Sequence, residues 1–262
     1  MNSNMAIGVN NLEILFRKAI SIKDLANRYN LITNIYKQKG YLQGVQTIEL
    51  NHSLEELILH DLACFEGIIN PLYYQDYLKN GVLIKCTDSN EVYFDKYHQS
   101  SIPFLAKSGE KSVGSARLIV SDLIGLPTLT DPTIIIYDDF KWVSQIECLE
   151  FSQFAVKAGT FTHVSVGILK ITYIYSKTKL KIHNWIAMID NNVLKFLNSN
   201  YFNFNFSIIG PSIDYLGSLC TPVYINIDNA LDNSAKYESS KPVADYIRDI
   251  DCSSFENNII EY

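Results

Sequence analysis

The chain has 262 residues, and 22 Lys and Arg against 28 Asp and Glu give it a net charge of −6. This acidic balance argues against a general nucleic-acid-binding protein, which needs a basic face to neutralise phosphates. Hydrophobic residues make up 47% of the chain and charged residues 19%, which is enough apolar material for a folded core. No apolar run approaches the length of a transmembrane helix, and the N-terminus is too polar and short for a signal peptide.

The cysteines and histidines give no sign of a disulfide framework or a metal site. The five cysteines are odd in number, lie far apart and contain no C-x-x-C pair. The five histidines show no ligand spacing, so no metal is expected. A reduced, cytoplasmic compartment fits this cysteine usage best.

The N-terminal part predicts a strand followed by a long helix. Residues 12–20 have the composition of a strand. Ser21 followed by Asp24 resembles a capping box, and apolar residues then recur at helical spacing. Gly40 is a plausible end for this helix because glycine readily adopts the left-handed conformation of a C-cap.

An insertion is predicted next. Ser53 followed by Glu56 has the form of a helix start and opens a helix over about residues 54–64. Residues 43–90 show no obvious strand partner, so they are interpreted as an inserted, mostly helical segment.

The rest of the chain is rich in predicted strands. Residues 108–110 have the composition of a hairpin turn. Residues 164–178 fit either a helix or a long strand, and we favour a helix; Asp190 can cap a short helix over 191–198. Strands are predicted over 102–107, 112–120, 133–137, 146–156, 182–189, 204–209 and 222–227. This order predicts an α/β fold with a mixed sheet in one domain.

The composition changes near residue 230. The segment 230–262 holds seven acidic residues against three basic ones, which favours a partly ordered, solvated acidic tail. Residues 1–229 would then form the domain. Val243, Tyr246, Ile247 and Ile250 have helical spacing, so a short helix that docks on the domain is the alternative.

Four segments, in this order along the chain, resemble the N-acyl amino acid synthases and, more distantly, the acyl-homoserine-lactone synthases. Residues 35–42 resemble a V-Y-x-x-E-G-Y-I segment, and residues 104–127 lead from a hairpin into a G-x-x-R-L strand. Residues 149–156 resemble E-x-S-R-F-x-V, and residues 208–217 resemble I-G-P-x-x-x-Y-x-G. The resemblance implies a GNAT-like acyltransferase fold, with a mixed central sheet flanked by helices.

The resemblance also implies three catalytic residues. Glu150 occupies the position of the motif glutamate, and a carboxylate there can take the proton that an attacking amine loses. Arg117 lies in the G-x-x-R-L strand, and Asp95 lies where the family has an acid, so an Asp95–Arg117 pair is expected. The alternatives are a solvent-facing Glu150 and a purely structural Asp95–Arg117 salt bridge.

The same strand is expected to bind substrate. In GNAT folds a bulge here separates two strands, the acyl-pantetheine arm enters the gap, and freed backbone N–H groups can hold the thioester oxygen. Gln153 stands where the family has an arginine, and Phe154 fits a core or acyl-pocket position. The substrate-binding candidates are Ser152, Gln153, Phe154 and Ala155.

The donor is inferred partly from an absent motif. Residues 157–163 contain one glycine and lack the Q/R-x-x-G-x-G/A pattern that cradles the CoA pyrophosphate. This favours the phosphopantetheine thioester of an acyl carrier protein over acyl-CoA, with no further cofactor. The alternating Lys177, Lys179 and Lys181 can form a docking site for the acidic carrier protein; the alternative is an ordinary solvated face.

Together these features predict an N-acyltransferase that moves a fatty acyl group from an acyl carrier protein to the amine of a small, amino-acid-like acceptor. Two alternatives stay open. One is an acyl-homoserine-lactone synthase. The late I-G-P-x-x-x-Y-x-G segment argues against it, because the resemblance gives this segment no clear counterpart in that family. The other is a catalytically inactive, GNAT-fold binding or regulatory protein, which is suggested by Gln153 and by the lack of arginines directly before the I-Y pair of the first helix.

Overall fold

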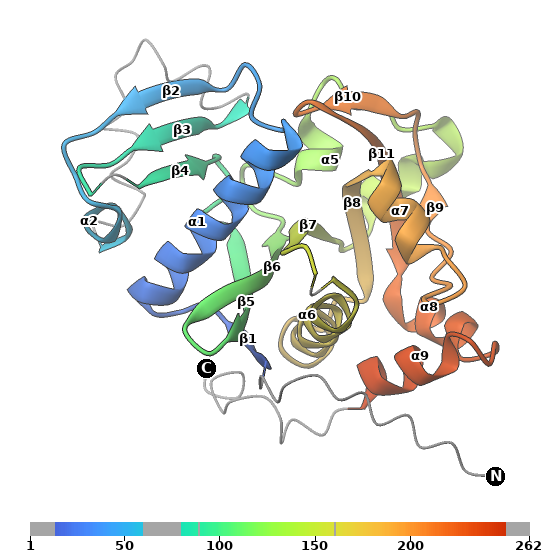
Figure 1. Ribbon diagram of the computed structural model, residues 1–262. Helices are drawn as coiled ribbons and strands as arrows, with labels where there is room; N and C mark the ends of the chain where they lie inside the picture. Colours follow the sequence, from blue (N-terminus) through green and yellow to red (C-terminus); the bar gives the residue numbers. More distant parts are fainter. Residues whose placement is uncertain (1–13, 60–79, 89, 160, 250–262) are drawn as a thin grey trace.

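A mixed sheet of eight strands forms the centre of the computed structural model (Figure 1). The structure describes residues 14–59, 80–88, 90–159 and 161–249. The strands follow the order β1–β5–β6–β7–β8–β11–β10, and β9 pairs with β11. Their bounds are Ile14–Lys18 (β1), Ser101–Ser108 (β5), Lys111–Val120 (β6), Leu149–Val156 (β7), Asn184–Asp190 (β8), Ser207–Ile208 (β9), Ile213–Tyr215 (β10) and Ser218–Asn226 (β11). The parallel β7–β8 pair among antiparallel neighbours makes the sheet mixed.

Helices cover both faces of this sheet, which confirms the expected fold class. Helix α6 (Phe161–Tyr175) packs on one face, where Val164 and Ile168 join Ala116 and Leu118 of β6 in the main core. Helix α1 (Ile22–Lys39) packs against β6 from the other side. Successive side chains of a strand point to opposite faces, so β6 serves both layers with alternate residues.

The first helix forms as its sequence predicts. The Ser21 hydroxyl accepts a hydrogen bond from the backbone N–H of Asp24 at 3.1 Å, and Gly40 ends the helix with φ +77°. Both ends therefore satisfy backbone groups that the helix itself leaves without partners. Tyr29 and Ile32 lie on the buried face.

The prediction of a mostly helical insertion at 43–90 is wrong for its described residues. Helix α2 (Leu54–Leu59) does form, with Glu56 bonded to the backbone N–H of Ser53, and the end of the predicted helix lies outside the described residues. However, β2 (Gln46–Glu49), β3 (Val82–Lys85) and β4 (Glu91–Phe94) form a second sheet. These strands bury alternate apolar residues against α1 and α2, which sequence alone did not pair.

Two other strand predictions differ from the structure. Residues 133–137 form no strand: in the described part of the chain the Ile134 N–H donates to the Asp131 carbonyl within a turn, and the Tyr137 N–H donates to the Ile209 carbonyl. A 3₁₀ helix follows at Asp138–Gln145. The predicted strand at 204–209 shrinks to β9, because Asn203 and Asn205 have positive φ, which interrupts an extended chain. Strand β10 was not predicted.

The described part of the acidic segment after residue 229 is folded. It contains the end of α8 (Ile227–Ser234) and the whole of α9 (Lys241–Arg248). Val243, Ala244 and Ile247 belong to the main core, and α9 packs against α6. This finding differs from the expectation of a solvated tail and agrees with the alternative of a docked helix. Among the described residues, no helix is both long and apolar enough to cross a membrane.

The packing of α9 predicts a stability effect. Ile247 is completely buried, so Ile247→Ala should lower the free energy of unfolding by about 2–4 kcal/mol. Asp245→Ala on the exposed face of the same helix should change it by less than about 0.5 kcal/mol. Urea unfolding of both variants checks this, and equal effects would mean that α9 lies outside the cooperative core.

Candidate active site

A cavity of about 600 Å³ lies where β7 and β8 separate, between α1 and α7 (Asn191–Leu197). The two strands pair in parallel at two positions, where Leu149 lies opposite Trp185 and Glu150 lies opposite Ile186. No further pair follows in either strand. Beyond this point the two strand edges face the cavity instead of each other. Backbone N–H groups on these edges are therefore available to a bound molecule.

A bulge in β7 widens the gap. Arg117 pairs with Ser152, and Ser115 pairs with Ala155, so β7 carries one residue more than β6 across this interval. Gln153 sits in the bulge with φ +49°, a conformation that residues other than glycine rarely adopt. The bulge bends the strand and directs this stretch toward the cavity.

The predicted Asp95–Arg117 pair forms at the floor of the cavity. The Arg117 guanidinium donates two hydrogen bonds to the Asp95 carboxylate, at 2.9 and 2.6 Å, and its Nε donates to the Ser152 hydroxyl at 2.7 Å. Arg117 is buried in the middle of β6. This two-pronged pairing is the geometry in which a buried guanidinium is best compensated.

Glu150 lies near this pair and is 2% exposed. Its carboxylate accepts hydrogen bonds from the backbone N–H of Thr128 at 2.8 Å and from the Thr128 hydroxyl at 3.0 Å. Burial raises the pKa of Glu150 to about 8, although the Thr128 hydrogen bonds and Arg117 oppose the increase. A carboxyl group with this pKa can gain and lose a proton near neutral pH, as a general base requires.

The pKa of Asp95 is shifted in the opposite direction, below its ordinary value. Burial by itself would raise the pKa of Asp95, but the charge and hydrogen bonds of Arg117 hold it below its ordinary value. The site thus contains one carboxylate that stays ionised and one that exchanges a proton near neutrality. Such a separation of pKa values is typical of acid–base sites.

Gln153 connects this cluster to α1. Its amide oxygen accepts a hydrogen bond from the Arg28 guanidinium at 2.5 Å, and its amide nitrogen lies 3.4 Å from an Asp95 oxygen. Arg28 was not predicted as a site residue. Its signal was a charged residue on a helix face that also carries Tyr29 and Ile32, because charged side chains are seldom buried without a role.

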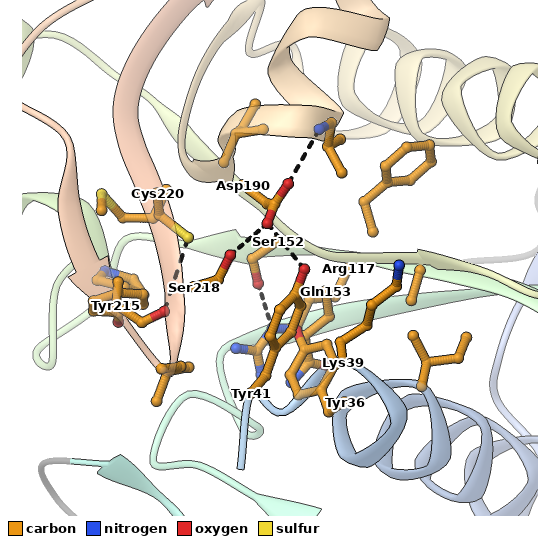
Figure 2. A pocket seen from close by; sticks show the side chains of 18 of the residues that line it. Tyr36, Lys39, Tyr41, Arg117, Ser152, Gln153, Asp190, Tyr215, Ser218 and Cys220 are labelled. Atoms are coloured by element: carbon orange, nitrogen blue, oxygen red, sulfur yellow. Dashed lines mark hydrogen bonds between the residues drawn. The ribbon is translucent and has the colours of Figure 1, made fainter. Parts of the chain in front are cut away.

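A hydrogen-bonded bridge crosses the cavity. The Asp190 carboxylate accepts from the Tyr41 hydroxyl at 3.0 Å and from the Ser218 hydroxyl, and it caps α7 as predicted. Figure 2 shows Tyr215 and Cys220 on one side of Asp190. The bridge therefore joins the end of α1, the end of β8 and the start of β11.

Glycine is required where the bridge closes. A Cβ on Gly217 would lie 2.6 Å from the Gly40 carbonyl oxygen, and Gly217 also has φ +75°. Leu216 before it has φ +52°, so the β10–β11 connection is a two-residue turn with both residues at positive φ. Gly217 ends the late motif found in the sequence, and this turn gives that motif a structural reason.

The structure brings most of the predicted residues together and leaves one group elsewhere. Seven of them line the cavity: Asp95, Arg117, Glu150, Ser152, Gln153, Phe154 and Ala155. Lys177, Lys179 and Lys181 do not line it. They lie after α6, next to the beginning of β8, whereas the cavity opens at the end of that strand. Lys177 pairs with Asp228 at 3.0 Å.

Other cavity residues were not named from the sequence as site residues. Tyr36, Tyr41 and Tyr215 lie in the family-like segments 35–42 and 208–217, whereas Tyr93, Tyr97, Asp190 and Ser218 lie outside all four family-like segments. The described residues hold no group of three His, Cys, Asp or Glu side chains that could bind a metal ion.

The sequence matches no protein-family model and no curated protein. Among solved structures, FeeM, an N-acyl amino acid synthase from uncultured soil microbes, is similar with 13% identity over 84% of this chain and 94% of that chain, at a TM-score of 0.49. The AHL synthase LasI is similar with 14% identity over 82% of this chain and 90% of that chain, at a TM-score of 0.48. Spermidine N-acetyltransferase from Vibrio cholerae is similar with 16% identity over 84% of this chain and 99% of that chain, at a TM-score of 0.42. Similarities at this level assign no activity, substrate or partner to this chain.

The cluster predicts that Asp95 and Arg117 are energetically coupled. Either single substitution to Ala leaves a buried charge without its partner, so the double variant should be more stable than the sum of the singles indicates, by about 1–3 kcal/mol. Thermal and urea unfolding of the four proteins measure this coupling. The exposed pair of Lys23 and Glu110 is the control and should be additive; additivity at Asp95 and Arg117 as well would contradict the prediction.

Proposed function

We propose that this protein is an N-acyltransferase that moves a fatty acyl group from an acyl carrier protein thioester to the amine of an amino-acid-like acceptor. The observation that carries the proposal is the position of Glu150. Its buried carboxyl group lies in β7, three residues before Gln153 of the bulge and at the last residue of β7 that pairs with β8. A proton acceptor thus stands beside the gap through which a thioester can enter.

The bulge in β7 supports the second requirement of the reaction, which is stabilisation of the negative charge on the thioester oxygen. Attack of an amine on a thioester places negative charge on the carbonyl oxygen, and oriented N–H groups stabilise that charge. The open edge of β7 after Glu150 offers such groups. The amine nitrogen bonds to the thioester carbon, Glu150 takes the proton that the amine loses, and the C–S bond breaks. Glu150 then returns that proton to the sulfur, so the pantetheine arm leaves as a thiol.

The cavity is lined by both polar and apolar side chains. This mixture fits a small polar acceptor next to an apolar acyl chain. Asp95, Arg117 and Tyr97 lie near Glu150, and the lining also includes the apolar side chains of Val193 and Phe196 of α7. A volume of about 600 Å³ is within the range of small-molecule sites. We propose the polar region for the acceptor and the apolar region for the acyl chain.

The first test is thiol release. The purified chain is incubated with acyl carrier proteins that carry acyl chains of varied length and with a panel of amino acids and amines, and the products are identified by mass spectrometry. N-acyl amino acids support the proposal. Acyl-homoserine lactones would instead support the related lactone synthase activity, and the absence of thiol release with every donor would indicate a binding protein.

Glu150→Gln should lower turnover by a factor on the order of 10²–10⁴, because the amide cannot accept the proton. Glu147→Gln is the matched control: Glu147 is exposed in the segment just before β7, so turnover should stay within about twofold. A Glu150→Gln variant with normal turnover would contradict the assignment of the base.

The pH dependence gives a separate prediction. A base must be ionised, and the pKa of Glu150 is raised to about 8, so turnover should rise with pH and level off above about pH 8. The residual activity of Glu150→Gln should lack this step. A rate that is constant or falls between about pH 6 and pH 9 would contradict the role of Glu150.

A further inference from the structure

Arg28 is a buried cation whose hydrogen-bonded partner is neutral. Its side chain lies on α1, the residue is 2% exposed, and its guanidinium donates to the Gln153 amide oxygen. The Nε atom of Arg28 is buried and has no hydrogen-bond partner in the described part of the chain. Buried charges are normally paired with an opposite charge, because their removal from water is costly.

The carboxylate that favours the charge on Arg28, Asp95, is shared with Arg117. Asp95 is held by two hydrogen bonds from Arg117 and so is already compensated. Burial lowers the pKa of Arg28 to about 10, which leaves it positively charged at neutral pH. Among the described residues, Arg28 is therefore a cation without an ion pair of its own, held by Gln153 beside the bulge of β7.

Gln153 is the element through which this charge acts on the cavity. It lines the cavity, sits in the bulge at φ +49°, and is held by Arg28 through its amide oxygen. That hydrogen bond orients the amide so that its nitrogen faces Asp95. A side chain fixed at both ends also fixes the strained backbone to which it is attached.

We propose that Arg28 is a positioning residue for acyl transfer, which fixes Gln153 and places a positive charge behind the backbone N–H groups of the bulge. This inference rests on the proposed function. In the transition state, negative charge on the thioester oxygen meets these N–H groups, and a cation behind them stabilises that charge further. The sequence motif has an arginine at the position of Gln153 on β7; here Arg28 of α1 donates to that glutamine, and Gln153 passes the effect of the charge to the cavity.

The test is a reciprocal exchange of the two side chains. Arg28→Gln removes the charge, Gln153→Arg places two guanidinium groups in contact, and R28Q/Q153R restores a single cation to the same place. Each single variant should lower kcat by roughly tenfold to a hundredfold, less than removal of a direct oxyanion donor. The double variant should recover to within about fivefold of the wild type, because the charge is restored.

The effect should fall on kcat and not on the KM for the acyl carrier protein, because Arg28 does not line the cavity. Arg28→Lys should be intermediate, because it keeps the charge and loses the planar fork. Arg17→Gln is the matched control: Arg17 also forms an ion pair at the base of α1, with Asp24 at 2.7 Å, and its kcat should stay within about twofold.

The outcomes separate this inference from the proposed function. Thiol release by the wild type and by R28Q at equal rates overturns the role of Arg28 alone. Losses in the single variants that multiply in R28Q/Q153R, without recovery, also overturn it, as does recovery of melting temperature without recovery of kcat. No thiol release from the wild type overturns the proposed function and this role with it. If R28Q does not fold, the comparison of R28K with R28Q/Q153R gives the same decision.

Discussion

The buried guanidinium of Arg117 is the constraint on which the site depends. It lies in the middle of β6, where water is excluded. Its charge therefore needs hydrogen-bond partners from other parts of the chain. It takes Asp95, which directly follows β4 of the small sheet, and Ser152, at the start of the β7 bulge. One side chain thereby connects the small sheet, the central sheet and the irregular part of β7, and it places the bulge next to the cavity.

The carboxyl groups of the buried Glu150 and the largely buried Asp95 show how the same chemical group acquires different roles. Asp95 accepts two hydrogen bonds from a guanidinium, and its pKa falls. Glu150 accepts hydrogen bonds from the neutral donors of Thr128, and burial outweighs these bonds and the charge of Arg117, so its pKa rises to about 8. The difference comes from the partner and not from the depth of burial, because both groups are withdrawn from water. The site can therefore keep one fixed charge and one exchangeable proton within the same cluster.

The cavity is closed by contacts between segments that are far apart in the sequence. Tyr41, Asp190 and Ser218 come from three different elements and meet at one carboxylate. Their meeting depends on the close approach of the Gly217 backbone to Gly40, which a side chain would prevent. The Asp190 cap of α7 was readable from local sequence, but its second role in the bridge was not.

The sequence alone determined the features that depend on local interactions or on a motif. The caps of α1, the hairpin between β5 and β6, and the placement of Glu150 within a strand follow from residues close together in the chain. Only the tertiary structure decided which segments meet. It paired β2 with β3 across 32 intervening residues, packed α9 into the core, and brought Arg28 of the first helix to Gln153, 125 residues away. Such contacts depend on loop closure and burial over the whole chain, which local periodicity does not encode.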